Sequence, residues 1–236
     1  MSISLKRAGA IFVKDYKEFS RNYAVSFSVI VPITFAFLFR SAGPSLPGAI
    51  GFLLNTSFVL LTCLVQACLI AEEKERNTLR TLMMTPATTM DVLIGKSTLV
   101  FVVSSVALAI ATSILGYEPV SMWAFVAAII LSIILYTAAG TICGLFSKTL
   151  LDASLSIMPV ALLFTGAPWG VLLAKDYPIF KVLDYMPSSQ LVHLLGIRSI
   201  GFTTGDLLKP LLIILAWTVL LTIVSVVLYQ RRLRDE

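Results

Sequence analysis

Six long stretches without a single charged residue constrain this chain more than any other feature. They cover residues 22–39, 41–71, 97–117, 119–147, 153–174 and 210–230. A helix that rises about 1.5 Å per residue needs roughly 20 residues to cross the hydrocarbon core of a bilayer. Because that core offers no water to a free backbone group, each stretch is predicted to be a transmembrane helix.

The composition agrees with a membrane protein. Charged residues make up 13% of the 236 residues, against about 25% in a typical soluble domain. We therefore predict an all-α integral membrane fold in which residues 1–236 form one transmembrane domain. Its six spans are expected at about 23–40, 48–71, 92–116, 121–146, 153–173 and 209–230.

The basic residues indicate how the spans are oriented. Of the 18 lysines and arginines, most lie near the two chain ends or between spans two and three. Cytoplasmic segments of membrane proteins carry this excess of positive charge. The pattern predicts a multi-pass protein of the cell membrane with both termini in the cytoplasm. It also explains the basic balance without a nucleic-acid surface.

The first helix is expected outside the membrane core. Apolar residues recur at steps of three and four within residues 3–21, at Leu5, Ala8, Phe12, Tyr16 and Phe19. A helix with this pattern and with lysines between lies in the membrane interface, its apolar face towards the lipid. It would serve either as a topology anchor or as a lever that a cytoplasmic partner touches.

The segment between spans two and three is dense in charge. Its sequence, EEKERNTLRTLMMTPATTMDVLIGK, begins with three glutamates and two basic residues and continues through an apolar stripe to a proline. A short helix over 72–86, with Glu72 paired to Arg76 at i+4, would fit a groove on another protein. The alternative is a solvated loop that only sets topology.

The tripeptide Gly95-Lys96-Ser97 looks like the end of a phosphate-binding loop. That loop needs a further glycine five positions earlier, where this chain has Met90. The residues that follow run into a membrane span. We therefore interpret the match as chance, predict no nucleotide site in this chain, and interpret Lys96 as a charge at the cytoplasmic mouth of span three.

The charged segment resembles that of a known family. AEEKERNTLRTLMMTPATTMDVLIGK is similar to the segment between spans two and three of type-2 ATP-binding-cassette exporter permeases, where an acidic-basic cluster precedes Gly-Thr-Leu, a proline and Gly-Lys. Asn77 stands where the family usually has glycine. The outer segment YMPSSQLVHLLGIRSI is also similar, with Met186 in place of asparagine. The resemblance covers essentially the whole chain.

The resemblance implies the membrane subunit of an export pump with the fold of the G-subfamily exporters. Residues 72–86 would be the coupling helix on a separate ATPase subunit, residues 3–21 the connecting helix, and residues 174–208 would hold re-entrant outer helices. Two permeases, as a homodimer or as sister chains, would join two ATPases that bind ATP and Mg²⁺. This chain would need no cofactor, metal or catalytic residue. The coupling residues would be Glu72, Glu73, Glu75, Arg76, Thr78, Leu79, Leu82 and Pro86.

Candidate residues for the translocation path lie on spans two and five, which face the two-fold axis in the family. Phe58, Thr62 and Gln66 share one helical face at steps of four, and Met158 and Leu162 do so on span five. Polar side chains at membrane depth usually face protein or a cavity. The alternative for Gln66 is a hydrogen bond between helices.

Several smaller features are interpreted as structural. The spacing Gly140-x-x-x-Gly144 allows another helix to approach closely. The three cysteines lie inside spans without metal-ligand spacing and are expected to pack as small apolar residues. Pro159 is expected to kink span five, and Ser188 and Ser189 are expected to cap a short outer helix.

The leading functional hypothesis is export of a hydrophobic or amphipathic cargo, such as a drug, a bacteriocin-like peptide or a lipid-like molecule. The middle of every span lacks charge, which favours such a cargo. Alternatives are a permease for haem, sodium or a polymer, and a membrane sensor or scaffold that docks a signalling partner. An enzyme fits least, because no nucleophile–base pair, metal cluster or carboxylate dyad lies near the spans.

Overall fold

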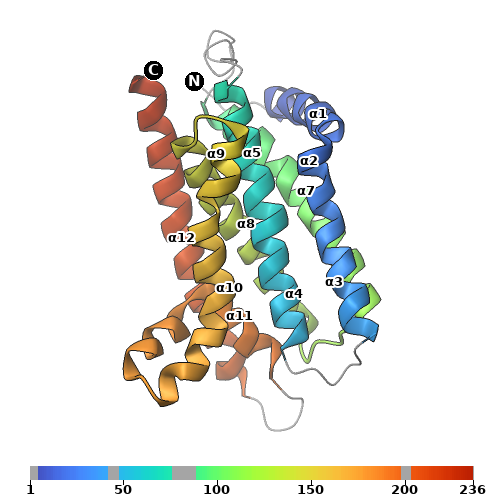
Figure 1. Cartoon of the computed structure of the whole chain (residues 1–236), viewed down its shortest axis with the longest axis vertical. Coiled ribbons are helices and arrows are strands. Elements are labelled where there is room, and N and C mark those ends of the chain that lie inside the picture. The colour runs from blue at the N-terminus through green and yellow to red at the C-terminus, as the bar shows by residue number, and fades with distance from the viewer. Residues whose placement is uncertain (1–4, 42–47, 76–88, 198–202, 236) are drawn as a thin grey trace.

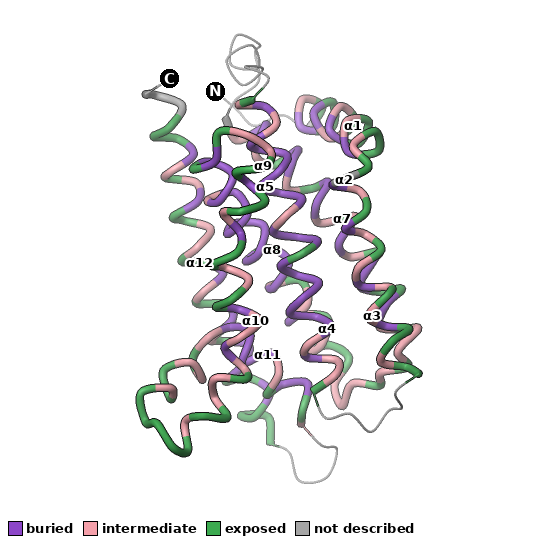
Figure 2. Tube along the Cα trace, viewed as in Figure 1, coloured by how far each residue is buried: buried purple, intermediate pink, exposed green. Residues whose placement is uncertain are grey.

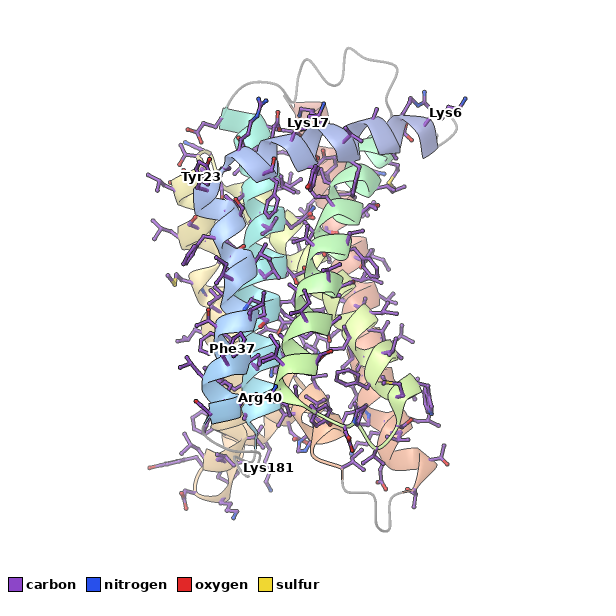
Figure 3. All side chains as sticks on the ribbon, turned by 90° about the vertical axis from the view of Figure 1, so that its right-hand side faces the viewer. Lys6, Lys17, Tyr23, Phe37, Arg40 and Lys181 are labelled. Carbon is purple, nitrogen blue, oxygen red and sulfur yellow. The ribbon has the colours of Figure 1, made fainter. Side chains whose placement is uncertain are left out.

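The computed structural model describes residues 5–41, 48–75, 89–197 and 203–235, and every regular element in these ranges is a helix. The long helices form one bundle, and α1 (Leu5–Arg21) lies across one end of it (Figures 1 and 3). Both chain termini lie at that end, which we call the α1 end (Figure 1). The predicted all-α class is confirmed.

The first two predicted spans are built from consecutive helical pieces. After α1 come α2 (Tyr23–Ser26), the 3-10 turn η1 (Phe27–Val29) and α3 (Ile30–Ser41). The next span is helical throughout, as α4 (Ala49–Ser57), the π-helical turn η2 (Phe58–Cys63) and α5 (Leu64–Glu75). π-helical turns are rare in proteins, and those that occur are often at functional sites. The turn η2 therefore makes span two a candidate functional element.

The middle spans are regular, and the fifth is broken. The unbroken helices are α7 (Thr89–Leu115) and α8 (Met122–Phe146). The fifth span divides at Ile157 into α9 (Leu150–Ser156) and α10 (Met158–Leu172). Pro159 lies in the first turn of α10, where the N–H that proline lacks would have no helical partner. The predicted break at this proline is therefore confirmed.

Short helices close the end opposite α1. They are η3 (Leu173–Lys175), η4 (Pro178–Tyr185) and α11 (Pro187–Leu195), which precede the long α12 (Thr204–Asp235). Helix α11 is largely buried and packs against α4, α10 and α12. Its existence was predicted, but its predicted cap is wrong. Ser188 and Ser189 lie buried within the first turn, and the cap position is Met186, because Pro187 suits the first helical position.

Several of these helices have the length and composition of membrane spans. The stretches long and apolar enough are Ala49–Glu75, Met90–Leu115, Met122–Phe146, Leu150–Lys175 and Thr204–Arg232, with a shorter apolar helix at Phe27–Ser41. Several helices of this length and composition are typical of a multi-pass membrane protein. The layout of six spans stays a prediction. Helix α5 is described as far as Glu75, past the predicted end of span two at residue 71, and the charged residues of this turn have partners inside the protein.

The second span forms the centre of the bundle. Helices α4 and α5 are mostly buried (Figure 2) and contact α7, α8 and α10. At Gly144 of α8, an added Cβ would lie 2.7 Å from the carbonyl oxygen of Ala67. Gly140 meets the backbone of Cys63 in the same way. The predicted close approach at these two glycines is confirmed, and all three cysteines are free and buried as expected.

The buried face of α1 differs from the predicted apolar stripe. Ala8 and Phe19 are buried as expected, but Tyr16 is 54% exposed. Ile11 and Asp15, which the stripe left out, are buried instead. The predicted face is therefore wrong in part, because α1 packs against α7 and turns a carboxylate towards the protein.

Candidate functional site

Helix α1 crosses the first part of α7 at a glycine. A Cβ on Gly95 would lie 2.9 Å from the carbonyl oxygen of Ala8 and 2.9 Å from the Cβ of Ile11. Real Cβ atoms do not approach so closely, so only glycine allows the two helices to meet here. The next residue is Lys96, and its side chain reaches beneath α1. The glycine and lysine of the apparent phosphate loop thus form a joint between two helices.

Lys96 lies at the centre of a buried cluster of charges. Its Nζ is 3.2 Å from Oδ2 of Asp15 on α1 and 3.0 Å from Oε1 of Glu73 on α5. It also donates to the carbonyl oxygen of Leu69 over 3.2 Å. Lys96 and Asp15 are fully buried, and Glu73 is 2% exposed. Lys96 lies in the first part of α7, and the sequence did not predict that its side chain is enclosed by three helices.

A second lysine extends the cluster towards solvent. Nζ of Lys14 is 3.1 Å from Oε1 of Glu73 and 3.6 Å from Oε2 of Glu18. Burial acts to lower the pKa of the Lys14 ammonium, but the charge and hydrogen bond of Glu73 raise it overall. Burial raises the pKa of the Asp15 carboxyl, and the Lys96 ammonium opposes that rise without reversing it. We call Lys14, Asp15, Glu73 and Lys96 the charge cluster.

The neighbours of Glu73 bind the ends of two other helices. Lys74 donates to the carbonyl oxygens of Leu145, at 2.7 Å, and Ser147, at 2.6 Å, where α8 ends. Oε2 of Glu75 accepts from the backbone N–H of Leu150, at 2.8 Å, where α9 begins. A cation at a helix C-terminus and an anion at an N-terminus both find free backbone groups and a favourable dipole. The last turn of α5 therefore contacts four helices.

The start of α1 has its own ionic contact with α7. Nε of Arg7 is 3.0 Å from Oδ2 of Asp91, a fully buried carboxylate in the first turn of α7. Together with the Gly95 crossing and the charge cluster, this contact binds α1 to α7 at three levels. In Figure 3, α1 lies across the top of the bundle between the labelled Lys6 and Tyr23. A shift of α1 along this surface would break charged contacts.

The candidate path residues of span two make contacts within the chain. The ring of Phe58 stacks on Tyr136 with centroids 5.3 Å apart. Thr62 donates to Ser104 over 2.9 Å, and Nε2 of Gln66 donates to Oγ1 of Thr141 over 3.0 Å. All three are fully buried. For Gln66, the alternative of a hydrogen bond between helices is the arrangement observed.

The candidate path residues of span five have the opposite environment. Met158 is 64% exposed and Leu162 is 79% exposed, both on α10. Farther along α10, a pocket of about 350 Å³ opens between α4, α10 and α11. Its lining is mostly apolar and includes the amide of Asn55 and the indole of Trp169. A carboxamide oxygen of Asn55 is buried there without a hydrogen-bond partner among the described residues.

Comparison with protein families decides what kind of membrane protein this is. A family model described as ABC-2 family transporter protein matches residues 11–228. The chain belongs to this ABC-2 transporter family. A comparison with curated proteins gave no match. ABC-2 membrane proteins are permease components whose ATPase is a separate subunit, so the match implies an ABC ATPase partner and confirms the type-2 ABC permease predicted from the sequence.

Within this ABC-2 permease, the predicted coupling residues divide into two groups. Glu72, Glu73 and Glu75 belong to the last turn of α5, and Glu73 and Glu75 contact other helices of the chain. The others lie outside the described residues: Arg76, Thr78, Leu79, Leu82 and Pro86. Their role on an ATPase stays a prediction. The acidic-basic cluster thus contributes to internal contacts that the resemblance alone did not indicate.

Sequence reasoning missed Asp15 and the central position of Lys96. One signal was available for each. Asp15 follows Ala8 and Ile11 at helical spacing, which puts an acid on the same face as buried apolar residues. Lys96 follows a glycine in a helix, where glycine is costly unless a close approach requires it. A buried acid on one helix and a buried lysine on another are then natural partners.

Proposed function

We propose that this chain is the membrane-spanning subunit of an ATP-driven exporter that moves a hydrophobic or amphipathic cargo outward. ATP and Mg²⁺ bind the separate ATPase subunit, and two permease chains, most simply two copies of this one, complete the pump. The observation that carries the proposal is the last turn of α5. It contacts α1, α7, α8 and α9, and it contains the first of the predicted coupling residues, Glu72, Glu73 and Glu75.

The geometry supports a mechanical link from the ATPase to the spans. Residues 76–86 come directly after α5 in the sequence, so in this proposal a displacement of that segment acts on the end of α5. Glu73 passes the displacement to Lys96 of α7 and to Lys14 of α1. Lys74 and Glu75 pass it to α8 and α9. Packed helices with discrete arrangements switch between states as units.

The cargo chemistry is supported by the faces that remain open. Met158 and Leu162 present an apolar surface on α10, and the pocket near Asn55 and Trp169 is apolar with few polar groups. Sites for small molecules are usually of this kind. In a pair of permeases, this side of α10 would line the route, and the pocket would hold cargo near the exit. Drugs, short apolar peptides and lipid-like molecules fit such a lining.

The first test asks whether an ATPase binds through the predicted coupling segment. The tagged chain is purified from its own cells in mild detergent, and ATP turnover of the bound proteins is measured. The Arg76→Glu, Leu82→Asp variant should lose the ATPase, whereas Lys181→Glu, a charge change at the opposite end, should retain it. If no ATPase arrives with the wild type, the proposal fails and a sensor or scaffold becomes the better hypothesis.

The second test separates binding from coupling. The three buried members of the charge cluster are replaced together by Asp15→Leu, Glu73→Met and Lys96→Met, because apolar side chains of similar size often maintain stability when buried partners change together; the partly exposed Lys14 is left in place. The ATPase should still bind and hydrolyse ATP. ATP-dependent uptake of a fluorescent apolar dye into everted vesicles, which reports outward transport, should be lost. Uptake equal to wild type would show that the cluster does not transmit motion.

A further inference from the structure

A groove on the side of the bundle shares one residue with the contacts above, Thr141, which lines it and accepts the hydrogen bond of Gln66. It has a volume of about 390 Å³ and lies between α7, α8 and α12. Its lining includes apolar side chains such as Ala138 and Val226. It also includes hydroxyl groups from all three helices, among them those of Ser97, Thr98, Thr137 and Thr222. The volume falls within the range of about 300–1,000 Å³ found for small-molecule sites.

The groove opens towards the membrane. Ile94 and Thr98 line it and are themselves exposed. On α7, Val102 and Val106 follow as exposed apolar residues, and on α12 Ile223 is 58% exposed beside the groove. In a chain with these spans, such a surface faces lipid tails. The occupant of the groove therefore comes from the bilayer.

The length of the groove matches one leaflet. The lining runs along α7 from Met90 to Phe101. At about 1.5 Å per residue this is roughly 16 Å, about half of a hydrocarbon core of ~30 Å. The groove begins at the α1 end, because Met90 is next to Asp91, which binds Arg7 of α1. An acyl chain of the leaflet next to α1 fits this depth.

Positive charge gathers where the groove begins. Lys6 is exposed on α1, next to Arg7, and lies at the end of that helix (Figure 3). On α12, the exposed Arg231 follows Val226 of the lining by five residues, which places it nearer the α1 end and on the side of the helix turned away from the groove. Basic residues at a membrane surface attract anionic headgroups. The charge of Arg7 is engaged by Asp91, so we assign no headgroup role to it.

We propose that this groove binds one acyl chain of an anionic phospholipid, with the headgroup at the α1 end of the bundle, where Lys6 and Arg231 are exposed. The apolar lining accepts the chain, and the hydroxyls of Ser97 and Thr222 lie among the groups that line its path. One hydroxyl, that of Thr222, is buried without a hydrogen-bond partner among the described residues. The lipid would fill the space between α7 and α12, which share α8 as a neighbour.

Native mass spectrometry tests the acyl-chain part. The full-length protein is reconstituted in equal amounts of phosphatidylglycerol and phosphatidylcholine, released in mild detergent, and the retained lipids are identified. Wild type should retain phosphatidylglycerol. Thr98→Trp fills the groove from its exposed edge and should lower retention about tenfold, the effect of displacing two methylene groups. Val106→Trp, on the same helix beyond the groove, is the matched control, and melting temperatures verify folding of both.

The headgroup part uses neutralised charges. Lys6→Gln with Arg231→Gln should reduce the preference for phosphatidylglycerol over phosphatidylcholine, by about fivefold for each charge removed. Lys175→Gln with Lys181→Gln, at the opposite end, should leave the preference unchanged. Equal retention by Thr98→Trp and Val106→Trp, or equal retention of both lipids by wild type, would overturn the proposal. So would a crosslink from the groove to another protein chain. The readout involves neither ATPase nor cargo, so it stands apart from the proposed transport.

Discussion

The second and fifth spans of this chain have opposite surroundings. In the most apolar part of each, 89% of the residues are buried in the second span and 17% in the fifth. The second span is held by hydrogen bonds from Thr62 and Gln66 and by the glycines of α8. The fifth presents Met158 and Leu162 outward. One helix is an internal support, and the other is a face available to a partner or to cargo.

This difference refines the path expected from the sequence. The resemblance assigned both spans to the two-fold axis, and the candidates on each had similar helical spacing. The structure separates them by environment: the polar candidates bind neighbouring helices, and the apolar ones remain open. Polarity at membrane depth therefore indicates internal bonding here, and the role of the exposed apolar residues of α10 in the route stays a prediction.

The largest effect is expected at Lys96 of α7, the ammonium that Glu73 of the second span contacts in the charge cluster. Lys96→Met leaves the carboxylates of Asp15 and Glu73 buried without their shared ammonium, so stability should fall by about 3–5 kcal/mol. Thermal unfolding of the purified chain in detergent measures this. Lys148→Met, an exposed lysine between α8 and α9, should unfold like wild type. Similar unfolding of both variants would remove the cluster from the list of stabilising contacts.

A glycine-to-alanine substitution should have opposite effects on stability where it presses on the second span, at Gly144 of α8, and where it lies on the fifth, at Gly166. Gly144→Ala brings a Cβ to 2.7 Å from backbone and side-chain atoms of α5, and such overpacking costs about 1–3 kcal/mol. Gly166→Ala on α10 meets nothing within 4 Å and should gain about 0.5–1 kcal/mol from helix propensity. Urea or thermal unfolding of both variants gives the comparison. Two changes of the same sign would contradict the contrast between the spans.

A smaller loss is expected from the internal hydrogen bond of the second span. Gln66→Met removes the bond to Thr141, and bonds of this kind in membrane bundles contribute about 0.6 kcal/mol. Gln230→Met, at an exposed position on α12, serves as the control. The melting temperatures of the two variants should differ, with Gln66→Met the lower. The same melting temperature would mean that Gln66 contributes little to helix association.

The smallest effect on stability is expected on the open face of the fifth span. Leu162→Ala should change the unfolding free energy by less than about 0.5 kcal/mol, because the side chain is exposed. If α10 lines the route, ATP-dependent efflux should nevertheless fall. Leu220→Ala, on the exposed side of α12, should leave efflux unchanged. Equal efflux by both variants would remove Leu162 from the path.

The sequence predicted the helical class and the approximate spans because charge-free runs of membrane length have few other structures available. It also predicted the close approach at Gly140 and Gly144, since two glycines on one helical face leave space for a backbone. It could not predict which helices enclose Lys96. That outcome depends on the angle at which α1 crosses α7, and one sequence contains no signal for helix crossing. The groove beside α8 depends on the same tertiary arrangement.

The joint between Asp15 and Lys96 also has a consequence for how the protein is made. The acid is synthesised about 80 residues before the lysine, on the order of ten seconds earlier at typical translation rates. Until Lys96 emerges, Asp15 has no reason to leave water, and Glu73 would repel it. Helix α1 must therefore wait at the membrane surface while spans two and three are inserted. The ion pair that holds the first helix cannot form until span two is complete and span three has begun, so docking of α1 can serve as a checkpoint for that stage of insertion.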